Sequence, residues 1–194
     1  MTRVCLIGDS DCNLQYELLS RETSREALAT YDLRRPFENS ISLRTVSVGA
    51  AVSLLNDLNW YLTRFVDEAL VQEPSVSEDE WLSRALATEL RNGDLEPADT
   101  AEFCKIYGLE RVGPDPDAGT ESADESEGDA AEPTANDAES DESADADETR
   151  AETTNWRLVE PLYVRRTGGE LPTYDLRDVD ETLVVRLTEA EHSP

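Results

Sequence analysis

The sequence predicts an α/β (or α+β) fold, with a small mixed sheet of about four strands and helices packed mainly on one face. Three observations support this fold class. Residues 1–112 alternate apolar runs of strand length with helix-like segments, and residues 153–194 regain strand patterning after a long acidic tract. With two strands and no helix, this last segment is below the size that folds alone. It is therefore predicted to complete the same domain.

The predicted insertion, residues 113–152, separates the two parts. It contains no aromatic residue and no Leu, Ile, Val or Met, and it carries 16 acidic residues against a single basic one, Arg150. Such a segment cannot bury a core, so we predict that it is intrinsically disordered. Its low-complexity composition favours a solvated spacer, and capture of a basic partner is the alternative.

Two strands are predicted in the first 50 residues. Residues 3–7 form an apolar run that ends at Gly8, and residues 41–48 alternate apolar and polar side chains up to Gly49. One helix or two short ones connect them, so we expect a parallel pair with a right-handed crossover. Both glycines would then lie at one edge of the sheet, where a neutral or metal-bridged ligand could bind.

Three helices are predicted after the second strand. The polar side chains of residues 50–71 form a narrow stripe, which is typical of a central core helix. A capping box over residues 77–80 predicts a second helix, which runs through Trp81 to residue 92. Pro97 starts a short third helix, in which Lys105 lies.

The C-terminal segment is predicted to contain two strands, residues 156–165 and 182–187, that form an antiparallel pair. The sequence Thr-Tyr-Asp-Leu-Arg precedes a strand twice, at residues 30–34 and 173–177. We interpret both copies as lead-ins whose tyrosine packs on the core. A duplicated ligand-contacting loop is the alternative.

The composition indicates a protein adapted to concentrated salt. The chain has 44 acidic residues against 17 basic ones, a formal net charge of -27, and Lys105 is its only lysine. At molar ionic strength the Debye length is about 3 Å, so a surface of carboxylates no longer repels itself, and arginine pairs with carboxylates through a planar fork. A halophilic cytosol explains this composition, and an acidic mesophilic protein with a disordered tract is the alternative.

Several function classes are excluded by what the sequence lacks. It has no apolar run of about 18 residues, and its N-terminus turns polar too soon for a signal peptide, so we expect a cytoplasmic protein without membrane contact. The single histidine, His192, lies in a tail predicted to fray, which excludes histidine-dependent catalysis. Three cysteines without C-x-x-C spacing, and the lack of phosphate-binding glycine motifs, predict no metal site and no cofactor.

The first predicted strand is followed by Asp9 and Asp11 in D-x-D spacing. This motif resembles the first motif of the haloacid-dehalogenase-like phosphatases, and the resemblance implies a nucleophilic Asp9, an acid/base Asp11 and magnesium. Those enzymes also need a positioned lysine and a downstream pair of acidic ligands, whereas Lys105 is predicted in a helix away from any strand. We therefore favour helix capping by both aspartates, and a metal-dependent phosphatase-like enzyme is the alternative.

Arginines and aromatic residues alternate on the predicted C-terminal strands. The candidate binding residues are Arg165, Arg166, Arg177, Tyr163 and Tyr174, because this pattern can hold phosphates and stack the bases of RNA. However, residues 153–194 also carry eight acidic residues, and phosphate contacts weaken as salt rises. Pairing of the arginines with carboxylates is therefore favoured, and an RNA-binding module is the alternative.

Residues 55–62, Leu-Asn-Asp-Leu-Asn-Trp-Tyr-Leu, together with the strand-helix start and the acidic insert, resemble small acidic haloarchaeal proteins with no named activity. The resemblance implies a cytosolic protein and nothing catalytic. We predict a non-enzymatic interaction or adaptor protein. Its protein partner would contact the predicted Trp81 helix and the C-terminal strands.

Overall fold

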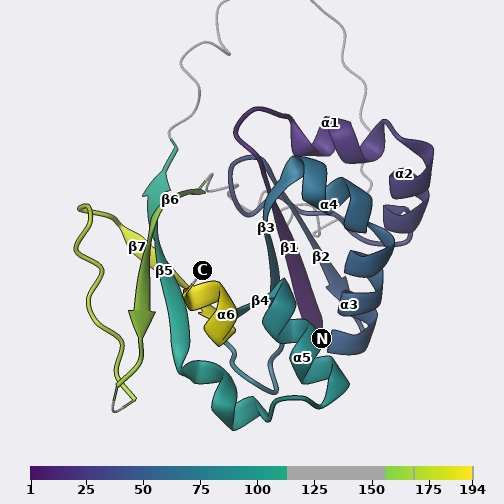
Figure 1. Ribbon diagram of the computed structural model, residues 1–194. Coiled ribbons are helices and arrows are strands. Elements are labelled where there is room, and N and C mark those ends of the chain that lie inside the picture. Colours follow the sequence, from purple (N-terminus) through teal and green to yellow (C-terminus); the bar gives the residue numbers. More distant parts are fainter. Residues whose placement is uncertain (113–155, 168, 194) are drawn as a thin grey trace, which may run out of the picture. The chain divides into compact units, whose positions relative to one another are not determined.

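The computed structural model describes residues 1–112, 156–167 and 169–193 (Figure 1). Within these residues the chain forms a seven-stranded mixed sheet with the strand order β2-β1-β3-β4-β7-β5-β6. The prediction of about four strands is therefore wrong, although the mixture of helices and strands agrees with an α+β class. The predicted insertion, residues 113–152, lies outside the described residues.

β1 (Thr2–Gly8) runs antiparallel to β2 (Ser40–Thr45), so the predicted parallel pair is wrong. Two short helices, α1 (Leu14–Leu19) and α2 (Glu22–Leu28), connect the strands. After them the chain returns to the end of β1, where the backbone N–H of Gly8 donates to the carbonyl oxygen of Asn39 at 2.8 Å. β2 thus starts beside the end of β1, and Gly8 and Gly49 lie at opposite ends of the strand pair.

The segment predicted as one helix over residues 50–71 forms α3 (Val48–Asp57), α4 (Asn59–Phe65) and β3 (Val66–Gln72). Leu58 interrupts the helix, with φ −85° and ψ 1°. β3 lies between β1 and β4, and Leu70 and Val71 are fully buried on its two faces. Only the last part of β3 is buried, and Asp67 and Glu68 at its start fit the polar stripe of the predicted helix, so the pattern of the helix continues into the strand.

The helix predicted from Trp81 starts three residues later. β4 (Trp81–Ser83) comes first, and α5 (Arg84–Asn92) follows it directly. The hydroxyl oxygen of Ser83 caps α5 by accepting a hydrogen bond from the Leu86 N–H at 3.1 Å. Ser77 accepts one from the Glu80 N–H at 3.1 Å, but the Glu80 carboxylate binds Arg166 and Arg186 and a strand follows, so the predicted capping box is wrong.

The helix predicted from Pro97 is a single 3₁₀ turn, η1 (Pro97–Ala101), followed by β5 (Phe103–Arg111). Lys105 therefore lies in a strand. β5 is antiparallel to both β6 (Trp156–Arg165) and β7 (Glu181–Leu187) and lies between them, so the predicted pairing of the last two strands is wrong. Both faces of β5 are buried, which removes the alternation that marks a half-exposed strand.

The chain ends in α6 (Glu189–His192), which a capping box between Thr188 and Glu191 starts. The His192 ring lies 5.0 Å from the ring of Phe103 on β5, between centroids. The tail that was predicted to fray therefore forms a helix that packs on β5.

Apolar side chains are buried on both faces of the sheet. On one face, Val4 and Leu6 of β1 pack with side chains of the five helices α1 to α5 (Figure 1). On the other face, Cys5 and Ile7 of β1 pack with Tyr107 and other side chains of β5 and β7. We call this second cluster the inner core.

The segment before β2 also contacts β6, the last strand in the sheet order. Phe37 forms a parallel bridge with Trp156 of β6, and the Glu38 N–H donates to the Trp156 carbonyl oxygen at 2.7 Å. Asn39 then takes a left-handed conformation, with φ 48°, and turns the chain into β2. Beyond Trp156, β6 therefore separates from this segment.

Candidate ligand-binding cavity

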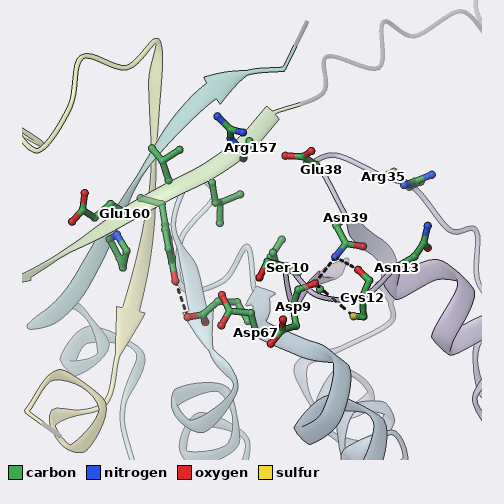
Figure 2. Close-up of a pocket in the computed structure, with 17 residues that line it drawn as sticks. Asp9, Ser10, Cys12, Asn13, Arg35, Glu38, Asn39, Asp67, Arg157 and Glu160 are labelled. Atoms are coloured by element: carbon green, nitrogen blue, oxygen red, sulfur yellow. Dashed lines mark hydrogen bonds between the residues drawn. The ribbon is translucent and has the colours of Figure 1, made fainter. Parts of the chain in front are cut away.

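A cavity of about 700 Å³ lies where β6 separates from the segment before β2 (Figure 2). One wall is β6, and the other is the end of β1, the loop after it and the start of β3. The charged residues that line it are Asp9, Arg35, Glu38, Asp67, Glu68, Arg157 and Glu160. We call it the β1–β6 cavity. Its volume is in the range of small-ligand sites.

Asn39 fixes the loop that follows β1. Its side-chain Nδ2 donates to the carbonyl oxygens of Asp9 and Cys12, both at 2.9 Å. Figure 2 draws these hydrogen bonds as dashed lines. Its Oδ1 accepts a hydrogen bond from the Leu14 N–H at 2.9 Å. A Cβ atom on Gly8 would come 2.4 Å from Nδ2 of Asn39, so this geometry requires a glycine at the end of β1. The hydrogen bonds of Asn39 thus position the backbone of Asp9 beside the cavity.

The two aspartates of the D-x-D motif differ in which pockets they line. Asp9 lines both the β1–β6 cavity and a neighbouring pocket beside Trp60, whereas Asp11 lines only the second of these. Oδ1 of Asp9 accepts a hydrogen bond from the Asp11 N–H at 2.9 Å, which closes a turn. Asn13, and neither aspartate, caps α1, by accepting a hydrogen bond from the Tyr16 N–H at 3.0 Å. The predicted capping by Asp9 and Asp11 is therefore wrong.

Glu68 of β3 binds the single lysine of the chain. Nζ of Lys105 and the hydroxyl of Tyr107, both on β5, donate to the same oxygen, Oε1 of Glu68, the hydroxyl at 2.7 Å. Lys105 is only 5% exposed. Burial raises the pKa of Tyr107, and the charge of Glu68 raises it further, so the hydroxyl keeps its proton and donates. The charge of Glu68 is thus neutralised within the protein.

Asp67, the residue before Glu68 on β3, is exposed, lines the cavity and forms no ion pair with any other described residue. Partial burial raises the pKa of its carboxyl, and the charge of Glu68 raises it further, while Lys105 lowers it in part. A carboxylate whose charged form is disfavoured in this way is stabilised by a cation that binds beside it.

The charges on the cavity walls favour a cationic ligand. Five carboxylates line the cavity against two arginines, Arg35 and Arg157. Nη2 of Arg157 donates to Glu110 at 2.9 Å and is thus already paired, whereas Arg35 forms no ion pair with a described residue. Glu68 and Glu160 are paired with Lys105 and Arg177, which leaves Asp9, Glu38 and Asp67 for a bound cation.

Magnesium, which the phosphatase resemblance implies, is bound by oxygen ligands such as carboxylates. Within residues 1–112, 156–167 and 169–193, no three His, Cys, Asp or Glu side chains converge as metal ligands. The downstream acidic pair that the phosphatase resemblance requires has a counterpart in Asp67 and Glu68, but Glu68 binds Lys105.

The C-terminal arginines form ion pairs with carboxylates. The pairs are Arg157–Glu110, Arg165–Glu102, Arg166–Glu80, Arg177–Glu110, Arg177–Glu160 and Arg186–Glu80. The arginines are thus paired with carboxylates, as the favoured interpretation predicts, but Glu160 is the only one of these partners that belongs to residues 153–194.

The five candidate binding residues of these strands differ in their surroundings. Tyr163 is half exposed, whereas Tyr174 is buried and donates its hydroxyl to the Glu160 carbonyl oxygen at 2.8 Å. The side chain of Arg166 is 14% exposed, and those of Arg165 and Arg177 are mostly exposed. The structure therefore provides no stacking platform that joins the two tyrosines.

The tyrosines of the repeated Thr-Tyr-Asp-Leu-Arg segments pack on the protein, as the lead-in interpretation predicts. Tyr31 contacts the cluster beneath the helices, and Tyr174 belongs to a separate cluster with Cys104 and Ile106. The two copies thus contribute to different clusters.

Sequence reasoning missed Asn39, Asp67 and Glu68 as site residues. Asp67 and Glu68 were part of the polar stripe of the predicted core helix, and nothing local marks Asn39. The available signal was Lys105, because a single lysine among 17 basic residues is unusual.

None of the described helices has the length and apolar character needed to cross a membrane.

Comparison with protein families gives one match for this chain. Residues 2–109 match the Family of unknown function (DUF5804). The chain belongs to this family. The DUF5804 region includes Asp9, Asn39, Asp67, Glu68 and Lys105, and it ends within β5, before the β6 wall of the cavity. Comparisons with curated proteins and with solved structures gave no match.

Proposed function

We propose that the protein is a non-enzymatic interaction protein of a halophilic cytosol that binds a basic side chain of a protein partner in the β1–β6 cavity. The observation that carries this proposal is the carboxylate of Asp67, which lines the cavity with no ion-pair partner among the described residues. Its neighbour Glu68 is matched by Lys105, so Asp67 is the carboxylate of β3 that is left for a ligand.

Concentrated salt makes the cavity a better site than the open surface. At molar ionic strength the Debye length is about 3 Å, so charges that are not in direct contact have little attraction. A basic side chain inside the cavity can contact Asp67 and Asp9 directly. An arginine suits it, because its planar fork donates to several carboxylate oxygens at once.

The two other functions that the sequence predicts have less support. A phosphatase-like reaction also needs a free pair of acidic ligands for magnesium, whereas Glu68 of the pair Asp67 and Glu68 is bound to Lys105. RNA binding needs free arginines, whereas those of the C-terminal strands are paired with carboxylates.

Titration calorimetry of the full chain in molar KCl, with the tripeptide acetyl-Gly-Arg-Gly-amide as the ligand, tests the proposal. We expect saturable binding that Asp67→Asn weakens about tenfold, as loss of a charge-assisted hydrogen bond would do. Asp57→Asn removes the same charge from an exposed position on α3 and should leave the affinity unchanged. Absence of saturable binding, or equal effects of the two substitutions, would overturn the proposal.

A further inference from the structure

We propose that the partner segment binds in an extended conformation and adds a strand to the free edge of β6, within the β1–β6 cavity. This inference rests on the proposed function and specifies its ligand. The ligand is then a short, extended peptide with basic side chains at alternate positions.

The first support is the free edge of β6. β6 is the last strand in the sheet order, with β5 as its only neighbour strand among the described residues. The Trp156 carbonyl accepts a hydrogen bond from Glu38, so the backbone of Trp156 points away from β5. Backbone groups alternate in direction along an antiparallel strand, so Leu158 directs its N–H and C=O to the same side.

The second support is that the space beside this edge is the cavity itself. The segment that contacts Trp156 turns away at Asn39, whose φ is 48°, so it does not continue along β6. Leu158 and the three residues after it line the β1–β6 cavity. Figure 2 shows Asp9 and Asp67 across the cavity from β6. A strand placed there could bond to Leu158 and direct a basic side chain to these carboxylates.

The third support is that the edge is protected only in part. Proteins commonly protect edge strands with charged side chains, bulges and prolines. β6 has a register shift opposite Tyr107 and Gly108, and Pro161, which lacks an N–H, follows directly. Leu158 lies before these features. The edge is therefore open over a short stretch, which limits the added strand to a few residues.

In strand addition, the backbone and the side chains of the bound peptide have different roles. Main-chain hydrogen bonds to the strand edge provide affinity, and pockets for alternate side chains provide specificity. Here Leu158 supplies the backbone groups, and Asp67 and Asp9 supply the charge.

The experiment compares two peptides on the full chain in molar KCl by titration calorimetry. The first is acetyl-Val-Arg-Val-Arg-Val-amide. The controls are two peptides of the same sequence with N-methyl groups on alternate backbone nitrogens. One peptide is methylated at the odd-numbered residues and the other at the even-numbered residues. N-methylation keeps the charges and removes the N–H groups on one side of the strand, so we expect one of the two methylated peptides to bind at least tenfold more weakly.

A protein variant provides a second arm. Leu158→Pro removes an outward N–H on an edge strand and leaves the β5 side of the ladder intact. We expect it to weaken binding of the pentapeptide at least tenfold.

The peptide comparison stands even if Leu158→Pro fails to fold. Equal binding of the unmethylated peptide and both methylated peptides overturns strand addition and leaves the proposed function intact. Binding of the arginine tripeptide without binding of the pentapeptide has the same meaning. If neither ligand binds, the proposed function fails as well.

Discussion

Glu68 on β3 binds Lys105 on β5, although β4 and β7 separate their strands in the sheet order. The contact is possible because both side chains project from the face of the sheet that carries the inner core. Side chains two residues apart on a strand point to the same face, so Glu68 projects on the face of Leu70, and Lys105 on the face of Tyr107. The ion pair therefore fixes the two halves of the sheet at the base of the β1–β6 cavity.

Lys105→Met is expected to lower the free energy of unfolding by about 3 kcal/mol, because it leaves the mostly buried carboxylate of Glu68 without its cation. Urea unfolding in molar KCl measures this effect. Adding Glu68→Gln to the same chain removes the unpaired charge and should restore most of the stability. A single variant as stable as the wild type would show that the pair contributes nothing.

Glu80→Gln is expected to lower the free energy of unfolding by about 2–4 kcal/mol at neutral pH, because the mostly buried Arg166 and Arg186 lose their shared anion. Burial alone would raise the pKa of Glu80, but hydrogen bonds from Arg166 and Arg186 outweigh it and bring the pKa below its ordinary value of 4.5.

The lowered pKa of Glu80 fixes the sign of the pH effect. The stabilisation is complete above the unfolded-state pKa and is lost as the pH falls through the lower folded-state value. Urea unfolding over a pH series should show the difference between wild type and Glu80→Gln shrink in acid. Glu78→Gln, at an exposed neighbouring position, is the control and should match the wild type throughout. A difference that does not change with pH would contradict this assignment.

Asp67→Asn is expected to stabilise the free protein at neutral pH. The pKa of Asp67 is raised by burial and by Glu68, so ionisation costs the folded state free energy above the unfolded-state pKa, and this cost disappears in acid. The gain should be at most about 1 kcal/mol, since water and salt screen an exposed carboxylate. Thermal unfolding at neutral and acid pH checks it. A loss of stability would show that Asp67 has a structural partner.

Gly8→Ala is expected to destabilise the protein by about 1–3 kcal/mol, because the new Cβ would meet Asn39 at 2.4 Å and Leu14 at 2.7 Å. Gly49→Ala is the matched control. Its Cβ would meet nothing closer than 3.7 Å, and alanine favours the helix by up to about 1 kcal/mol. Urea unfolding of both variants should therefore give effects of opposite sign. Equal effects would contradict the role of Asn39 at the end of β1.

Local signals allowed four of the seven strands to be predicted. β1 is buried on both faces but was predicted because Gly8 ends its apolar run, and β2, β6 and β7 were predicted from strand patterning. β3 was missed because Asp67 and Glu68 fit the polar stripe of a helix, and β5 because burial of both its faces removes the alternation of a half-exposed strand. β4 was missed because three residues are too few to show a period.

The site could be predicted only in part, because it is assembled from distant segments. Asp9 was found because it follows a strand directly. Asp67 and Glu68 lie at the cavity because β3 is next to β1 and because β5, which carries Lys105, packs near them. This strand order depends on segments far apart in the sequence, so no local pattern predicts it. Asn39 holds the loop after β1 through the hydrogen bonds of its side chain and turns the chain through its left-handed backbone. Neither role can be predicted from a single asparagine in a loop.

The most direct test of the binding site is its position on the molecule. Backbone amide shifts of the isotope-labelled full chain, recorded while acetyl-Gly-Arg-Gly-amide is added in molar KCl, locate the ligand residue by residue. The largest shifts are expected at Gly8, Asp67 and Leu158, which line the β1–β6 cavity from three different strands. Shifts that gather around Tyr163 and Arg165 instead, or no shifts at saturating peptide, would contradict a basic-ligand site between β1 and β6.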